Sequence, residues 1–386
     1  QSYKSITIKQ EAPKIPAGSS ELRPHRAAVG LYDLKDGQLI RRKSVELDIT
    51  GDLTQVKELS GEKLADLVLI NDHDLTYAKI RFDARSIATL KAHLGKLDDG
   101  LSRALCWSAA WDMFRDAELS ATDFIEIALT GLAGEDDITT VTALMSQLNT
   151  AVEIYASDKN RDSLREKVAG ALLSLLKSAK AGSDHQLQFA RSFAALAHSK
   201  EQGAEIRNIL DGKFQDLKID ADLRWHLILC LVERGLSTRA EIDAELKGDN
   251  TLTGGLSHER CIAAFPTLEA KEAAFNKATE DESITNWSRL SAIQGYNRPI
   301  QRHLHEGFVD RYFDLILETY NTKSYEVSTS IIDLLYPSYL ISTQTLAKTD
   351  AWLNGPGKDS HPTLRRHILE AKDSLERALR VRAIDK

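Results

Sequence analysis

Three consecutive polar residues near the end of the first quarter of the chain could bind a metal ion. Asp72, His73 and Asp74 carry carboxylate and imidazole groups, which are common metal ligands. A calcium loop that starts at Asp72 would need glycine at its sixth position and glutamate at its twelfth. These positions hold Tyr77 and Asp83, so the residue that permits the sharp turn is missing. The sequence instead favours a tight turn between strands, whose side chains bond local backbone amides.

A zinc peptidase site would need His-Glu-x-x-His on a helix, which places two histidine ligands one turn apart and supplies a general base. The chain begins this motif at His258-Glu259 and again at His305-Glu306, and both times it lacks the second histidine. His303 and His305 are two residues apart, so they would point in different directions from a helix. The sequence therefore predicts surface or core histidines at these places.

Other catalytic motifs are also incomplete. Residues 255–259 end in glutamate where G-x-S-x-G requires glycine, and residues 355–359 lack the first glycine and the Ser/Thr of a phosphate-binding loop. Cys106 and Cys230 lie in apolar segments, which indicates buried helical residues rather than nucleophiles.

Composition narrows the class of protein further. A length of 386 residues favours two or more domains. The net charge of −7, with both signs interspersed, argues against a nucleic-acid partner. No apolar run reaches the length of about 18 residues that a membrane span needs. Three widely spaced cysteines indicate a reducing compartment, so we expect a cytoplasmic protein without a membrane partner.

The hydrophobic pattern changes at residue 83. Before it, Asp36-Gly37 between apolar segments is typical of a hairpin turn, residues 45–49 alternate, and residues 67–70 form a short apolar run, as in a buried strand. Residues 1–83 are therefore predicted to form a small β-sandwich.

After residue 83 the period is helical. Leu164, Val168 and Leu172 share one helix face, and residues 364–379 repeat this pattern near the C-terminus. A long series of short amphipathic helices favours a large HEAT- or armadillo-like superhelical domain over residues 84–386. The expected fold class is mainly α, with a small N-terminal β-sandwich.

One segment at this border carries a family likeness. "LVLINDHDLTYAKIRFDARSIATL" resembles the end of the third domain of the aminopeptidase N family of zinc aminopeptidases, where an apolar strand and an Asn precede a Tyr-Tyr-Arg-Val-Asn-Tyr-Asp pattern. The matching positions are Asn71, Tyr77, Lys79, Ile80, Phe82 and Asp83, whereas Ala78 and Arg81 depart from the pattern.

Three further segments extend the likeness over nearly the whole chain. Residues 103–127 resemble early helices of the family's fourth domain in its actinobacterial form, and residues 361–383 resemble its closing helix. Residues 295–316 are similar to a family helix in which Asn297, Arg302 and Phe308 have counterparts. The resemblance implies the C-terminal region of such an enzyme, with the β-sandwich as a spacer and the helical domain as a cap.

The family's active-site motifs are missing here, because they belong to a catalytic domain that this chain does not contain. The resemblance therefore implies that the zinc lies in that domain of the parent enzyme, that this chain holds no cofactor, metal ligand or catalytic residue, and that it is inactive alone. Its expected function is to close the substrate chamber of an enzyme that removes N-terminal residues from peptides, and to help bind the distal part of the peptide. The implied partners are the N-terminal and catalytic domains of the same polypeptide, together with peptide substrates.

The candidate peptide-contacting residues are Tyr296, Arg298 and Arg302, since an arginine can hold a carboxylate through two hydrogen bonds. The alternative for these arginines is pairing with surface acids or capping of a helix C-terminus. The alternative function is a stand-alone helical-repeat module that binds another protein.

Overall fold

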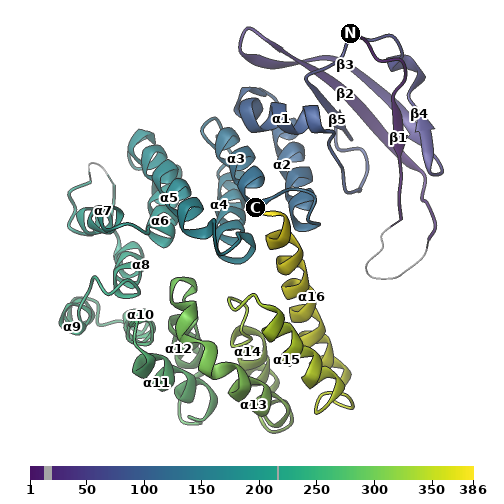
Figure 1. Ribbon diagram of the computed structural model, residues 1–386. Coiled ribbons are helices and arrows are strands. Elements are labelled where there is room, and N and C mark those ends of the chain that lie inside the picture. The colour runs from purple at the N-terminus through teal and green to yellow at the C-terminus, as the bar shows by residue number, and fades with distance from the viewer. Residues whose placement is uncertain (13–19, 215–216) are drawn as a thin grey trace. The chain divides into compact units, whose positions relative to one another are not determined.

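The computed structural model describes residues 1–12, 20–214 and 217–386. The chain is mainly helical with a small N-terminal sheet region, as the sequence predicted (Figure 1). The last strand ends at Ile70 and the first α-helix begins at Ala84. By compactness the chain divides into a first unit, Gln1–Leu148, and a second unit, Asn149–Lys386. The domain boundary at residue 83 and the superhelical repeat stay predictions.

The first unit begins with two small antiparallel sheets. One has the strand order β3-β2-β5 and the other pairs β1 with β4. Their bounds are β1 Thr7–Lys9, β2 His25–Lys35, β3 Gln38–Ile49, β4 Leu53–Gln55 and β5 Leu67–Ile70. Side chains from both sheets, among them Ile8, Val29 and Ile49, share one buried core. The predicted Asp36-Gly37 hairpin joins β2 to β3, and both turn residues have the positive φ that a tight two-residue turn requires.

Helices complete the first unit and begin where polar side chains cap them. The first helix α1, Ala84–His93, starts after Asp83, whose carboxylate accepts hydrogen bonds from two backbone amides of the first turn. The other helices of this part of the chain are α2 Gly100–Arg115, α3 Ala121–Leu132 and α4 Ile138–Thr150, which runs across the boundary between the units.

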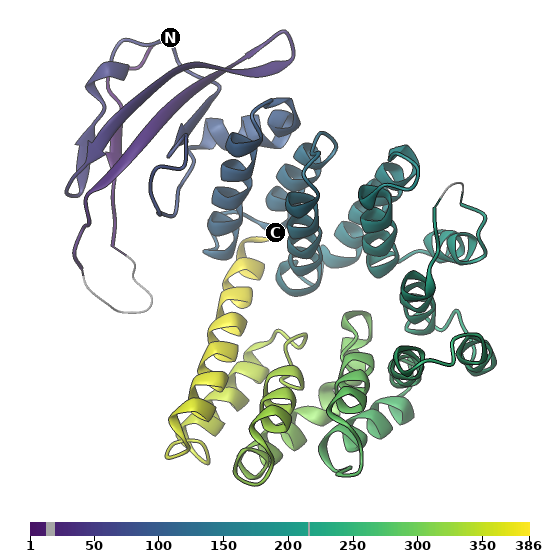
Figure 2. The same cartoon turned by 180° about the vertical axis from the view of Figure 1, so that it is seen from behind.

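The second unit is a succession of helices whose path curves back on itself. Its elements are η3 Ala151–Tyr155, α5 Arg161–Ser178, α6 Asp184–Leu196, α7 Lys200–Leu210, α8 Ala221–Val232, α9 Arg239–Gly248, α10 Leu252–Ala263, α11 Leu268–Thr279, α12 Asn286–Tyr296, η4 Pro299–Leu304, η5 Glu306–Phe308, α13 Val309–Thr322, α14 Tyr325–Leu334, α15 Thr343–Asn354 and α16 Pro362–Ile384. The last helix, α16, packs against the first element, η3 (Figures 1 and 2). None of the helices within the described ranges is both long and apolar enough to cross a membrane.

Candidate functional site

The polar turn after β5 contributes to the packing of the first unit. Asp72 is 0% exposed, accepts a hydrogen bond of 2.6 Å from the Tyr32 hydroxyl, and its Oδ2 lies 3.0 Å from Nε of Arg41. Asn71, not Asp72, makes the predicted local bonds, since its side chain bonds both the amide and the carbonyl of Thr76. The prediction of a turn between two strands was wrong, because the element after β5 is the helix α1. The residues that the structure describes contain no group of three His, Cys, Asp or Glu side chains placed to hold a metal.

Tyr296 lies at the C-terminal end of α12 and is only 4% exposed. Its ring stacks on His305 with the ring centroids 4.4 Å apart, and its carbonyl lies 2.9 Å from Nε2 of that histidine. The hollow beside the tyrosine has a volume of about 10 Å³, which is room for one water molecule at most. The Tyr296 side chain therefore packs within the core.

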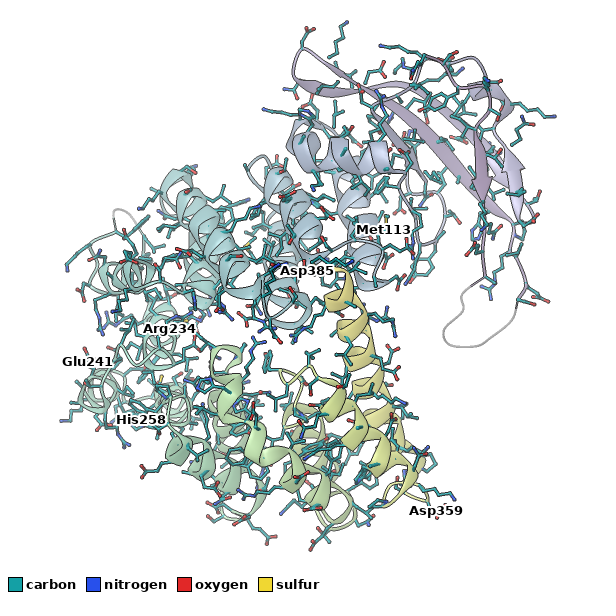
Figure 3. The ribbon with its side chains drawn as sticks, in the orientation of Figure 1. Met113, Arg234, Glu241, His258, Asp359 and Asp385 are labelled. Atoms are coloured by element: carbon teal, nitrogen blue, oxygen red, sulfur yellow. The ribbon has the colours of Figure 1, made fainter. Side chains whose placement is uncertain are left out.

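The Arg298 side chain binds a buried carboxylate at the end of α8. Its Nε donates to Glu233, the residue that ends α8, and Arg234 donates to the other oxygen of the same carboxylate. Burial alone would raise the pKa of the Glu233 carboxyl, but the two guanidinium groups lower it below its ordinary value. Figure 3 labels Arg234 among the side chains of the second unit. Arg298, Glu233 and Arg234 form one Arg–Glu–Arg triad.

Arg302 forms a second triad with Glu153 and Arg165. Nε and Nη2 of Arg165 each donate to the Glu153 carboxylate at 2.9 Å, and Nη2 of Arg302 donates to the same group. Nη1 of Arg302 also donates to the Glu153 carbonyl at 3.0 Å. Burial, followed by the positive charge of Arg161, lowers the pKa of Arg302 to about 10. Arg298 and Arg302 are thus four residues apart yet bind glutamates from different elements, one at the end of α8 and one in η3.

The C-terminal turn of α16 lies beside the second triad. Nε of Arg382 donates to the Ile154 carbonyl at 2.9 Å, and the Asp385 carboxylate accepts from the Ser157 amide at 2.9 Å. Figure 3 labels Asp385 at this end of the helix. These bonds join residues more than 220 positions apart and fix the end of the second unit to its beginning.

Tyr339 is a functional candidate that the sequence did not reveal. This half-buried residue is close enough to both triads for Arg298, Glu153, Arg302 and Glu233 to affect its pKa, which burial raises. Within the described part of the chain its hydroxyl has no hydrogen-bond partner. Each triad carries one more positive than negative charge, so the surface around Tyr339 combines a free hydroxyl with two partly exposed guanidinium groups. This arrangement can bind a carboxylate or another anionic group.

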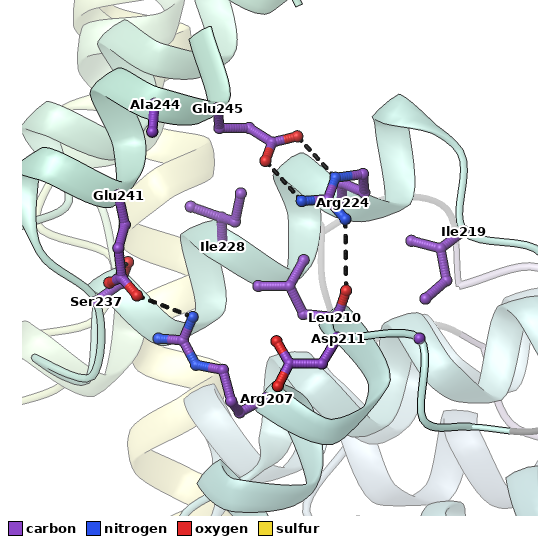
Figure 4. A pocket seen from close by; sticks show the side chains of 11 residues that line it. Arg207, Leu210, Asp211, Ile219, Arg224, Ile228, Ser237, Glu241, Ala244 and Glu245 are labelled. Carbon is purple, nitrogen blue, oxygen red and sulfur yellow. Dashed lines mark hydrogen bonds and ion pairs between the residues drawn. The ribbon is translucent and has the colours of Figure 1, made fainter. Parts of the chain in front are cut away.

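A separate pocket of about 560 Å³ lies between α7, α8 and α9 (Figure 4). Arg207 pairs with Glu241 at 3.2 Å, and Arg224 holds Glu245 through two bonds of 2.7 Å. Both arginines of its wall therefore already have carboxylate partners.

Comparisons with known proteins identify the family of this chain. The model of the ERAP1-like C-terminal domain family matches residues 67–377. A curated relative named aminopeptidase N, from Streptomyces lividans, is 40% identical over 99% of this chain. The chain spans 45% of the length of that relative. The chain therefore belongs to the ERAP1-like C-terminal domain family and corresponds to the C-terminal region of aminopeptidase N family enzymes.

Proposed function

We propose that this chain is the non-catalytic part of a zinc metallo-aminopeptidase that removes N-terminal residues from peptides. In this proposal it closes the substrate chamber and binds the distal part of the peptide, while the catalytic domain of the same polypeptide holds the zinc. Family membership supports the assignment. Its three free cysteines fit a reducing, cytoplasmic setting for the parent enzyme.

The surface of Arg298, Arg302 and Tyr339 is the observation that carries the peptide-binding role. The side chains of Arg298 and Arg302 are 19% and 16% exposed, so each can contact a ligand while it keeps its bond to a glutamate. A carboxylate that binds there would contact positive charge in a partly desolvated setting, where charge-assisted hydrogen bonds are strong. Peptide contact by Tyr296 stays a prediction, and it would require this side chain to become exposed.

Binding far from the scissile bond can assist the reaction. Energy from remote contacts can offset the cost of orienting the peptide N-terminus at the metal. The spacer role of the β-sandwich belongs to the same proposal, because a rigid element between catalytic and helical parts would fix the distance over which a peptide must reach.

Replacing Tyr339 with phenylalanine is expected to weaken peptide binding by about five- to tenfold, because one hydrogen bond to the ligand is lost. The fold should be unaffected, since the hydroxyl bonds nothing among the described residues. Fluorescence anisotropy of a dye-labelled peptide with a free carboxylate end measures this effect on the purified chain. Tyr325→Phe removes the hydroxyl of an exposed tyrosine and is the matched control.

A second variant, Arg302→Met, removes one guanidinium group and leaves Glu153 paired with Arg165. It should weaken binding further, and an amidated peptide should bind weakly to the wild-type chain as well. Equal affinity of wild type and both variants for the free-carboxylate peptide, or the same affinity for the amidated peptide, would contradict the proposed site.

A further inference from the structure

Lys271 joins the ends of two helices from inside the second unit. The residue lies in the first turn of α11 and is 0% exposed. Its Nζ donates to the carbonyls of Ala263 and Gly295, both at 3.0 Å. Ala263 is the last residue of α10 and Gly295 the penultimate residue of α12, so both carbonyls are among those that a helix leaves without an internal partner. The amine therefore caps both helices at once.

The two capped helices pack closely at the same place. A Cβ atom added to Gly295 would lie 2.2 Å from the carbonyl oxygen of Arg260, so only glycine permits this approach of α12 to α10. A change in the bonds of Lys271 thus acts on a tightly packed contact that has no spare room.

The surroundings of Lys271 disfavour its ammonium form. An ammonium group has three N–H donors, whereas the structure provides two acceptors. The ionisable groups that interact with it are Glu233 at the end of α8, Arg298 before η4 and His305 after η4. Burial and then Arg298 lower the pKa of Lys271 to about 7, while Glu233 opposes them. Burial and the charge of Lys271 hold the pKa of His305 at about 3, so this histidine is neutral when the lysine titrates.

We propose that Lys271 is a pH-sensitive clasp between α10 and α12, which tightens as the pH rises through neutrality. Below the folded pKa, the lysine is protonated in both the folded and the unfolded chain, so the folded state bears the full cost of a buried ammonium. Between the folded value and the ordinary value of 10.5, only the unfolded chain binds the proton, so stability rises with pH. The clasp is a property of the helical unit and does not depend on peptide binding.

Urea unfolding of wild type and Lys271→Met tests the clasp. From about pH 6.5 to about pH 8.5, the folding constant of wild type relative to the variant should rise about twentyfold. Both proteins contain the other groups that titrate in this range, so the effects of those groups cancel in the ratio of the two folding constants. Lys277→Met removes a lysine from the same helix that pairs with Glu259 at 3.3 Å, and it should leave the pH dependence of wild type unchanged.

If Lys271→Met does not fold, the titration of wild type decides the question. In wild-type protein labelled with ¹³C at lysine Cε, one resonance should titrate near neutrality. This resonance should be absent from the Lys271→Arg variant, which assigns it to Lys271. A constant stability ratio across the pH range, or lysine resonances that all titrate near their ordinary pKa, would overturn the proposal.

Discussion

Replacing Glu153 with alanine is expected to destabilise the second unit by about 3–5 kcal/mol, because it leaves buried charges without their partner. The carboxylate accepts two bonds of 2.9 Å from Arg165 and a further bond from Arg302. Among the described residues, Arg302 would then have no paired carboxylate, and Arg165 would keep only its bond to Asp162 at 2.7 Å. Chemical unfolding, followed by circular dichroism, measures the loss of stability.

Two comparisons make the Glu153 result specific. Glu166→Ala removes an exposed carboxylate from α5 and should change the free energy of unfolding by less than about 0.5 kcal/mol. Adding Arg302→Met to Glu153→Ala should recover part of the loss, since it removes the arginine that has lost its paired carboxylate. A loss below about 1 kcal/mol for Glu153→Ala would show that the triad does not hold the second unit together.

Asp72→Asn is expected to cost about 3 kcal/mol of stability in the first unit, because it removes the charge that faces the Arg41 guanidinium in a buried site. The same carboxylate accepts a hydrogen bond of 2.6 Å from the Tyr32 hydroxyl. Burial and, after it, this hydrogen bond raise the pKa of Tyr32. The asparagine variant keeps the shape of the side chain, so the loss reports on charge rather than on packing. Thermal unfolding measured with the same buffer for all variants gives the difference.

Asp74→Asn is the matched control in the same turn. Asp74 is exposed and has a φ of 55°, a conformation that asparagine adopts readily. We expect a change within about 0.5 kcal/mol. If Asp72→Asn and Asp74→Asn had equal effects, the interpretation of Asp72 as the buried centre of this junction would be wrong.

Local signals in the sequence predicted the elements of the fold well. The Asp36-Gly37 dipeptide gave the hairpin because few residues other than glycine, asparagine and aspartate tolerate positive φ at both turn positions. Pro362 in the first turn of α16 is another local signal, since proline lacks only an N–H that this turn leaves unpaired. Such signals act over a few residues and need no tertiary context.

The partners of the candidate site could not be read from the sequence in the same way. Arg302 meets a glutamate 149 positions earlier, and Arg298 meets one 65 positions earlier. The acids that these arginines meet are not the surface acids of the alternative, since Glu153 and Glu233 are 4% and 3% exposed. Arg302 also bonds the backbone carbonyl of Glu153. Tyr339 lies outside the regular helices, so no helical period marked it.

The burial of Lys271 could not be predicted from the sequence either. A lysine in an amphipathic helix is ordinarily predicted to face solvent, because an ammonium group is costly to bury. Here the closely packed ends of α10 and α12 enclose it and offer two carbonyl acceptors. Only the arrangement of three helices in space makes this position suitable for an amine.

The assignment of this chain to the non-catalytic part of an aminopeptidase is tested most directly by assaying the purified chain on a fluorogenic aminoacyl substrate in the presence of zinc. Activation of water by a metal needs protein ligands and a base, and the sequence lacks the His-Glu-x-x-His motif that supplies them in zinc peptidases. We expect no turnover above that of the zinc-containing buffer. Turnover that copurifies with the chain and disappears when a chelator is added would contradict the assignment.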